Sequence, residues 1–112
     1  MRVERSISIA KTPADVLAYM ADIRNDPAWH TDVLEVSSST DAVQVGTVFK
    51  VRVKPSMGVS EGTMTVRRLE PGKLVEFEGH MGKMDPTVTN LVEPEGAATR
   101  VIRRVDLDPR AR

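Results

Sequence analysis

Apolar and polar residues alternate along most of this chain, which is typical of strands with one buried and one exposed face. The clearest case opens at Gly46, where Phe49, Val51 and Val53 point to one side and the basic residues between them point to the other. Similar alternation recurs along the chain and is bounded by turn residues. The pattern predicts strands over residues 1–10, 32–38, 46–54, 62–69, 74–80, 87–92 and 98–107.

The segment from Thr12 to Asp32 departs from this alternation and predicts a pair of short helices. Thr12 is a suitable N-cap residue, Pro13 suits the first helical position, and Asp15 faces the positive end of the helix dipole. Apolar residues recur at helical spacing as far as Ile23, so we expect the first helix to bury one apolar stripe.

The second helix of the pair is expected near the end of that segment. Proline disfavours helical backbone in the residue before it, so the first helix should stop ahead of Pro27. Asp26 can cap the second helix, with Pro27 at its first position and Trp29, the single tryptophan, inside it. The apolar side of the pair, ending in Trp29, would then lie on the sheet.

The composition is that of one soluble domain over residues 1–112. Sixteen basic residues balance sixteen acidic ones, which gives no reason to expect binding to nucleic acid or to an anionic membrane. The chain has no cysteine, which excludes disulfides and thiolate chemistry. It also has no stretch long enough to cross a membrane and no signal-peptide core near Met1, so a cytoplasmic location is expected.

The predicted elements imply an α+β fold. Seven strands, with two helices between the first and second and short turns joining the last six, would form a curved antiparallel sheet with the helices on one face. Turns of such a meander alternate between the two ends of the sheet, so loops predicted at 55–62 and 79–86 should share one end with the end of the last strand. Met57, Met81 and Met84 fall in or beside these loops. A flexible apolar rim around a ligand, a dimer contact and incidental loop methionines remain open interpretations.

Five segments spread over nearly the whole chain carry a family resemblance. They are ISIAKTPADVLAYMAD, NDPAWHTDVLEV, VGTVFKV, LEPGKLVEFEG and TRVIRRVDL. In this order the chain resembles the helix-grip fold of the START-like superfamily known as SRPBCC, and within it the polyketide cyclase/dehydrase-like proteins. The resemblance implies an apolar cavity between the concave sheet and a long C-terminal helix. Most such proteins bind or carry a hydrophobic molecule there, and a minority are cyclases, aromatases or dehydrases.

The sequence departs from that family at its carboxyl end, where it stops at Arg112 with no room for the long helix. Without this helix the concave face would lie partly open, which is unfavourable for a monomer. We therefore expect a second copy to cover it in a homodimer, with a ligand, another partner or a truncated chain as the alternatives. The residues expected on this face are Phe49, Val51, Val75, Phe77, Val101 and Val105.

The candidate ligand-binding residues lie on this face or on the helices above it. Arg103 stands in the apolar side of the last strand, where its planar guanidinium could hold the polar head of a ligand; the alternatives are a bulge that turns it outward or pairing with an internal acid. Tyr19 could offer a hydroxyl to the cavity, although a position that only flanks the helix face is the favoured interpretation. The full candidate set is Tyr19, Trp29, Phe49, Val51, Met64, Phe77, Val101 and Arg103.

The sequence contains no motif with the spacing of a catalytic or metal centre. His30 and Asp32 could form an acid–base pair, but no nucleophile is near in sequence, so a structural or surface role is favoured. His80 shares the phase of the glutamates before it and should face solvent, and two histidines without helical spacing predict no metal site. The glycine-containing run 79–82 lacks the lysine and the helix of a phosphate-binding loop, so no cofactor is expected.

Three functional hypotheses are compatible with the sequence. The first is a module that binds a small hydrophobic ligand, lipid or polyketide-like, in a cavity on the concave face without catalysis of its own. The second is a cyclase or dehydrase, which would need an acid–base pair in the cavity, for which Arg103, Tyr19 and His30 are the available residues. The third is a protein-interaction module that uses the open sheet face. We prefer the first, although a fold resemblance does not establish function.

Overall fold

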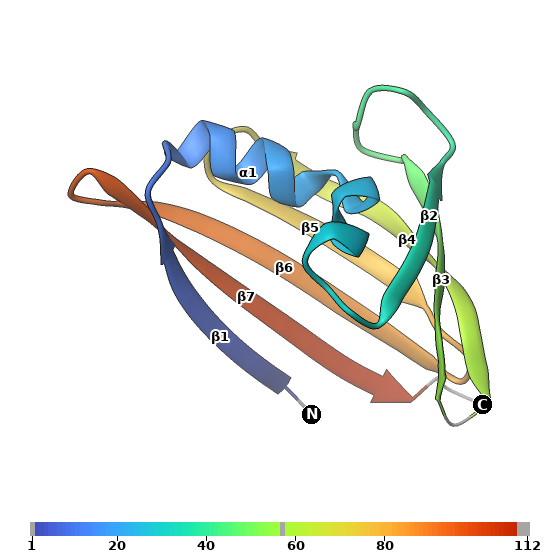
Figure 1. Ribbon diagram of the computed structural model, residues 1–112. Coiled ribbons are helices and arrows are strands. Elements are labelled where there is room, and N and C mark those ends of the chain that lie inside the picture. Colours follow the sequence, from blue (N-terminus) through green and yellow to red (C-terminus); the bar gives the residue numbers. More distant parts are fainter. Residues whose placement is uncertain (1, 57, 110–112) are drawn as a thin grey trace.

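In the part of the chain that the structure describes, residues 2–56 and 58–109, seven antiparallel strands form one curved sheet (Figure 1). The coordinates are a computed structural model. The spatial order is β1-β7-β6-β5-β4-β3-β2, so β2 to β7 form a meander and β1 pairs with β7. The strands are β1 (Arg2–Ile9), β2 (Val33–Ser38), β3 (Val48–Ser56), β4 (Val59–Glu70), β5 (Leu74–His80), β6 (Met84–Glu95) and β7 (Ala98–Pro109).

Two short helices connect β1 to β2 and cover the concave face of the sheet (Figure 1). Helix α1 (Pro13–Ala21) packs against β5, β6 and β7, and the 3₁₀ helix η1 (Ile23–Ala28) packs against β2. This arrangement confirms the predicted helix-grip type of α+β fold. Strand β7 is the last element among the described residues, so no C-terminal helix lies on the sheet in this part of the chain.

Helix α1 begins as the sequence predicts. The Thr12 hydroxyl accepts a hydrogen bond from the Asp15 backbone N–H at 3.3 Å, and Pro13 occupies the first turn. Val16 and Leu17 are buried against the sheet, which confirms the predicted apolar stripe.

The second helix begins earlier than predicted. Asp22, not Asp26, caps η1, and its carboxylate accepts a hydrogen bond from the Arg24 backbone N–H at 3.1 Å. Because Asp22 is an equally good cap and comes first in the chain, Pro27 lies inside η1 and Trp29 follows its end. Trp29 is 42% exposed, so the expectation that it lies within the helix and on the sheet is wrong.

The core lies between the helices and the middle of the sheet. Phe49 on β3 and Phe77 on β5 meet edge to face, with their ring centroids 6.3 Å apart. Five residues of the face that was expected to lie partly open are buried, because α1 and η1 already cover it; only Val105 is half-buried. The five are Phe49, Val51, Val75, Phe77 and Val101.

A bulge changes the faces of β2. The register of β2 against β3 shifts between Val33 and Glu35. As a result Val33 and Val36 both pack against the core, while Leu34 is 40% exposed. Plain alternation over the predicted strand 32–38 places Leu34 and Val36 on one face, and that prediction is wrong.

Both predicted loops are tight turns. Strand β3 continues to Ser56 and β4 starts at Val59, while Met81 and Met84 form an isolated bridge at the start of β6. Gly58 and Gly82 have φ angles of 78° and 64°, which make these reversals short. The two turns share one end of the sheet with the end of β7, as predicted (Figure 1). Met57 lies outside the described residues.

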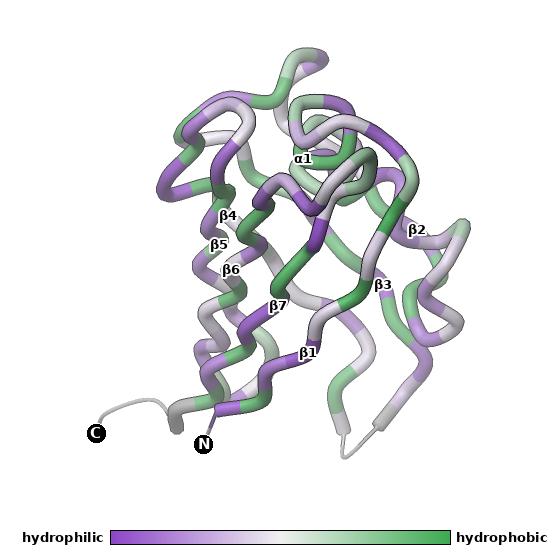
Figure 2. Tube along the Cα trace, turned by 90° about the vertical axis from the view of Figure 1, so that its left-hand side faces the viewer, coloured by the Kyte–Doolittle hydropathy of each residue, from purple (hydrophilic) through white to green (hydrophobic). Residues whose placement is uncertain are grey.

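Strand β1 forms an edge of the sheet. Figure 2 shows that hydropathy alternates along the strands, and Ile9 at the end of β1 packs against the core. Val3 is 39% exposed and Ile7 is 60% exposed, so the predicted half-buried strand is wrong at these two positions.

Candidate functional site

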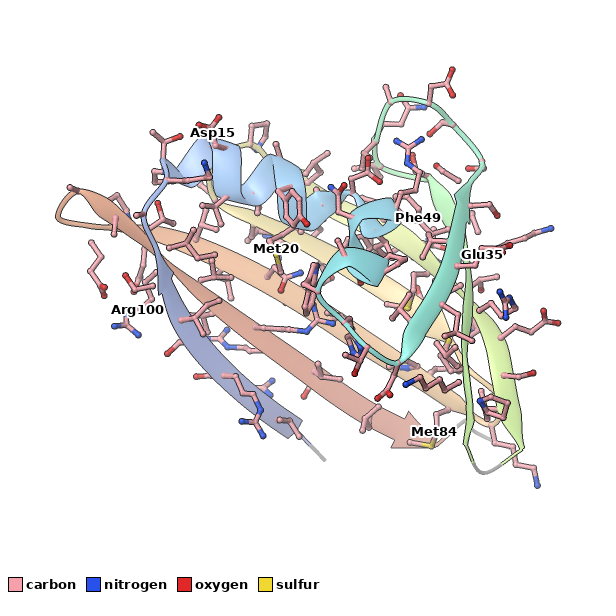
Figure 3. All side chains as sticks on the ribbon, in the orientation of Figure 1. Asp15, Met20, Glu35, Phe49, Met84 and Arg100 are labelled. Atoms are coloured by element: carbon pink, nitrogen blue, oxygen red, sulfur yellow. The ribbon has the colours of Figure 1, made fainter. Side chains whose placement is uncertain are left out.

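A partly open cavity of about 330 Å³ lies between the helices and the concave face. Its wall is mostly apolar, and its residues come from both helices and from all strands except β1. Figure 3 shows the Met20 side chain pointing from α1 toward the sheet. The residues that line the cavity are Met20, Ile23, Asp26, His30, Val33, Val51, Val53, Met64, Phe77, Met81, Pro86, Val88, Asn90, Arg103 and Val105.

Two glycines let the apolar floor of the cavity pack closely. A Cβ atom at Gly79 would lie 2.6 Å from the Met64 sulfur and 2.9 Å from Cγ of Pro86. A Cβ atom at Gly62 would collide with the Met81 sulfur. The rigid neighbours limit these positions most, because a Cβ at Gly79 meets the Pro86 ring and one at Gly62 would lie 2.5 Å from the His80 carbonyl oxygen.

The polar part of the wall centres on Asn90. This residue is 1% exposed, and neither its amide nitrogen nor its amide oxygen has a hydrogen-bond partner among the described residues. Asn90 on β6 stands directly across the ladder from Arg103 on β7, so the two side chains share the concave face. An unpaired buried amide costs stability, and such groups in native proteins call for an explanation.

Arg103 also has unused hydrogen-bonding capacity. Its guanidinium lies 5.6 Å from the centre of the Trp29 ring, in a cation–π contact, and its side chain makes no hydrogen bond to any described residue. Burial lowers the pKa of Arg103, and the negative charge of Asp26 partly opposes this effect. The predicted position of Arg103 on the apolar side of the last strand is correct, and no bulge turns it outward.

Asp26 supplies the acidic group of the cavity. Its backbone carbonyl ends η1 by accepting hydrogen bonds from the N–H groups of Trp29 and His30, at 3.0 and 2.8 Å. Burial raises the pKa of the Asp26 carboxyl to about 6, although the positive charge of Arg103 lowers it. Among the described residues Asp26 makes no direct ion pair with Arg103, so the attraction between them acts over a longer distance.

His30 lies in the cavity wall beside these groups. Its Nδ1 accepts a hydrogen bond from the Asp32 backbone N–H at 3.3 Å, and its ring is 5.5 Å from that of Trp29. The Asp32 carboxylate does not line the cavity, so the two residues form no acid–base pair in this wall. His80, as predicted, is exposed, and its ring lies 2.8 Å from the Asp85 carboxylate.

The structure brings together half of the sequence-predicted site residues. Val51, Met64, Phe77 and Arg103 line the cavity. Phe49 and Val101 are instead buried in the core beneath the helices. Tyr19 is 45% exposed on α1, outside the cavity wall, in agreement with the favoured interpretation.

Trp29 is not part of the cavity wall and reaches it only through Arg103. Asp26 and Asn90, in contrast, are cavity residues that sequence reasoning missed. The phase of Asn90 was a usable signal, because it alternates inward with Val88 and Val92. Asp26 gave no such signal, because it lies in an irregular segment and was assigned to capping.

These groups give the cavity an amphipathic character. One part of the wall offers methionine, valine and phenylalanine side chains, and another offers a guanidinium, an amide, a carboxyl and an imidazole. Among the described residues no three metal-ligating side chains cluster together. The arrangement suits an apolar molecule with one polar group.

The chain matches the family model described as polyketide cyclase/dehydrase and lipid transport over residues 1–112. Among the curated proteins, none is significantly similar to it in sequence. No helix in the described part of the chain is long and apolar enough to cross a membrane.

Many solved structures share the fold. The Zhui aromatase/cyclase from Streptomyces sp. R1128 superposes with a TM-score of 0.77 at 18% identity, over 100% of this chain and 70% of that one. A START superfamily protein from Mycobacterium smegmatis gives a TM-score of 0.75 at 12% identity, over 98% of this chain and 78% of its own. For Ara h 8.0201 the TM-score is 0.75 at 12% identity, over 99% and 78% of the two chains. At these identities the similarity establishes the fold alone.

Proposed function

This chain belongs to the polyketide cyclase/dehydrase and lipid transport family of the SRPBCC superfamily, and from that membership we propose that it binds a small hydrophobic ligand in its concave cavity. One observation carries the proposal: a cavity of about 330 Å³ with a mostly apolar wall lies beneath α1 and η1. This volume is at the lower end of the range for small-molecule sites, roughly 300–1,000 Å³. In this proposal the protein carries its ligand without chemical change and acts in the cytoplasm.

Binding can be tested with N-phenyl-1-naphthylamine, a neutral dye whose fluorescence rises in apolar sites. We expect saturable binding to the protein. A Val53→Trp substitution should fill part of the cavity and weaken dye binding at least about tenfold, because overpacking excludes the ligand. Lys54→Trp, one residue further on the outer face, is the matched control and should bind normally. Absence of saturable binding to the unmodified protein would contradict the proposal.

A cyclase or dehydrase activity is the second candidate, and Asp26 is the observation that favours it. A buried carboxyl with a pKa of about 6, near a guanidinium, can exchange protons close to neutral pH. The test is deuterium exchange at the α-carbon of an enolisable β-diketone, followed by NMR in D₂O. Catalysed exchange that disappears in Asp26→Asn and persists in Arg104→Gln would favour the enzyme over the carrier.

We also propose that a second copy of the chain packs against the uncovered edge of the sheet to form a homodimer. The support is the exposure of Val3 and Ile7 on β1, which no helix covers in the described residues. Binding of a different protein at the same strand is the alternative. The measured stoichiometry distinguishes a homodimer from such a complex.

A further inference from the structure

We propose that Asn90 and Arg103 form a head-group subsite for a carboxylic acid, so that the ligand is a medium-chain amphiphile with an acid head. The inference rests on the proposed function and specifies the chemical class of its ligand. The cavity leaves the hydrogen-bonding groups of both side chains unpaired among the described residues.

The Asn90 amide requires both a donor and an acceptor. Its two polar atoms are buried and unpartnered among the described residues, and the residue itself is 1% exposed. A carboxylic acid group offers a carbonyl oxygen to the amide N–H and an O–H to the amide oxygen, in two parallel hydrogen bonds. A ketone supplies only an acceptor, and an alcohol has a single oxygen, so neither satisfies both atoms equally well.

Arg103 selects an acid over other groups that could pair with the amide. Its guanidinium faces the same cavity from the neighbouring strand and makes no side-chain hydrogen bond to a described residue. The planar guanidinium can donate from its edge to a carboxyl oxygen while the amide pairs with the same group, and its positive charge favours an acid over a neutral amide. Trp29 holds one face of the guanidinium, with the ring centre 5.6 Å away, and leaves its N–H edge for a ligand.

Asp26 makes the binding of an acid dependent on protons. With a bound ligand the cavity holds two carboxyl groups and one guanidinium, so its charge is balanced when one of the two carboxyl groups is protonated. Before binding, near neutral pH, the ligand acid is ionised, and Asp26 is mostly ionised because its pKa is about 6. Binding of a carboxylate from neutral solution should therefore take up about one proton.

Few other charged groups lie close enough to alter this balance. Asp22 precedes Asp26 in η1 and is paired with Arg24 of the same helix, His30 lies in the same wall, and Arg103 approaches from β7. The elements packed against η1 contribute little more: β2 carries Glu35, which is exposed and paired with Arg52, and α1 carries Asp15 in its first turn. His30 is thus the titratable group in the wall that has to be separated from Asp26 experimentally.

The cavity dimensions favour a single medium-length chain over a two-chain lipid. About 330 Å³ of partly open space, walled by Met64, Met81, Val88 and Val105 beyond the polar groups, suits decanoic acid. Decan-1-ol has the same chain with a neutral head and is the matched probe.

The test measures the affinities of decanoic acid and decan-1-ol by displacement of N-phenyl-1-naphthylamine. Between about pH 8 and pH 7, the affinity for decanoic acid should rise about tenfold, and the rise should level off toward pH 6, where Asp26 becomes protonated in the free protein too. The affinity for decan-1-ol should stay constant. Calorimetry in buffers of different ionisation enthalpy should give an uptake of about one proton per decanoic acid bound.

Substitutions assign the effect to individual groups. Arg103→Gln and Asn90→Leu should each weaken decanoic acid binding at least about tenfold and leave decan-1-ol binding within about twofold. Asp26→Asn should abolish the pH dependence, whereas His30→Gln should preserve it. Arg104→Gln, on the outer face of β7 where the wild-type side chain pairs with Glu4, is the control and should change neither affinity.

The outcomes separate this inference from the proposed function. Equal affinity for the acid and the alcohol, or an unchanged pH dependence in Asp26→Asn, would overturn the head-group subsite while leaving a hydrophobic cavity. Failure of the dye and of both decyl probes to bind would overturn the proposed function itself. Should Arg103→Gln fail to fold, Arg103→Lys keeps the charge but lacks the planar fork, and it should still lose affinity for the acid.

Discussion

Asn90 and Arg103 face each other across the β6–β7 ladder, and neither side chain makes a hydrogen bond to a described residue of the protein. Two strongly polar groups placed side by side in an otherwise apolar wall are unfavourable for folding alone. Their position in the cavity provides a reason, because a ligand with a polar head would satisfy both. Stability and binding should therefore respond in opposite directions to the loss of the Asn90 amide.

Asn90→Leu should stabilise the protein. The substitution replaces a buried unpaired amide with an apolar side chain of similar size, and we expect the free energy of unfolding to rise by about 1–2 kcal/mol. Urea unfolding measures the change. A clear loss of stability would mean that the amide is paired in the folded protein.

Thr99→Val is the matched comparison for that experiment. Thr99 is also fully buried, but its hydroxyl donates a hydrogen bond of 2.6 Å to the Lys11 carbonyl oxygen. Removal of this donor should cost about 1 kcal/mol. Buried polar residues with and without partners should thus change stability with opposite signs.

Trp29 should report on the occupancy of the cavity. It is the single tryptophan of the chain, and its ring contacts the Arg103 guanidinium at the cavity wall. A ligand that pairs with Arg103 should move the guanidinium and change the tryptophan emission. Titration with decanoic acid should alter the fluorescence of the unmodified protein, whereas Arg103→Met should remove most of the response.

Ile7→Glu should abolish the proposed homodimer without unfolding the protein. Ile7 is 60% exposed on the edge strand, so a charge there should change the free energy of unfolding by no more than about 0.5 kcal/mol. The measurement is sedimentation velocity at micromolar concentration, with Ser6→Glu, beside Arg100 on the other face of β1, as the control. If the unmodified protein sediments as a monomer, the dimer proposal is wrong.

Most of the fold could be predicted because local patterns and long-range packing agree. The alternation of Phe49 with Val51 and of Val75 with Phe77 identified the inward faces of β3 and β5 correctly. Proline followed by glycine between the predicted strands 62–69 and 74–80 is typical of a tight turn, and the turn is present, with a φ of 72° at Gly72. These features depend on neighbouring residues alone.

The errors arise where tertiary contacts override a local rule. The bulge near Leu34 depends on how β2 registers against β3, and periodicity does not encode that register. The exposure of Ile7 depends on which elements cover an edge strand. The polar groups of the cavity were missed for a similar reason, because Asp26 and Asn90 approach the site from different elements and share no sequence motif.

Asp26→Asn should stabilise the protein at alkaline pH and have no such effect in acid. Burial is the main reason that the pKa of Asp26 rises from 3.8 to about 6 in the folded protein. Between these two pH values the folded state therefore binds more protons than the unfolded state does. The protonated carboxyl contributes fully to the free energy of unfolding below about pH 3.8, and this contribution is lost as the pH rises through about 6. At about pH 8 the free energy of unfolding of the variant should exceed that of the unmodified protein by on the order of 2 kcal/mol. One pKa unit corresponds to about 1.4 kcal/mol, and solvent contact reduces the full effect.

Asp22→Asn gives the comparison of opposite sign in the same helix. The hydrogen bond from Arg24 lowers the pKa of Asp22 in the folded protein. Ionised Asp22 therefore stabilises the folded state at pH values above its pKa in the unfolded chain. This stabilisation is lost as the pH falls through its pKa in the folded protein. Asparagine remains a good cap, which isolates the effect of charge.

Urea unfolding from about pH 8 to pH 4 should show the advantage of Asp26→Asn shrinking toward zero, because Asp26 becomes protonated over this range. An advantage that stayed constant over the range would show that Asp26 is not desolvated, and it would also remove the basis for proton uptake on ligand binding.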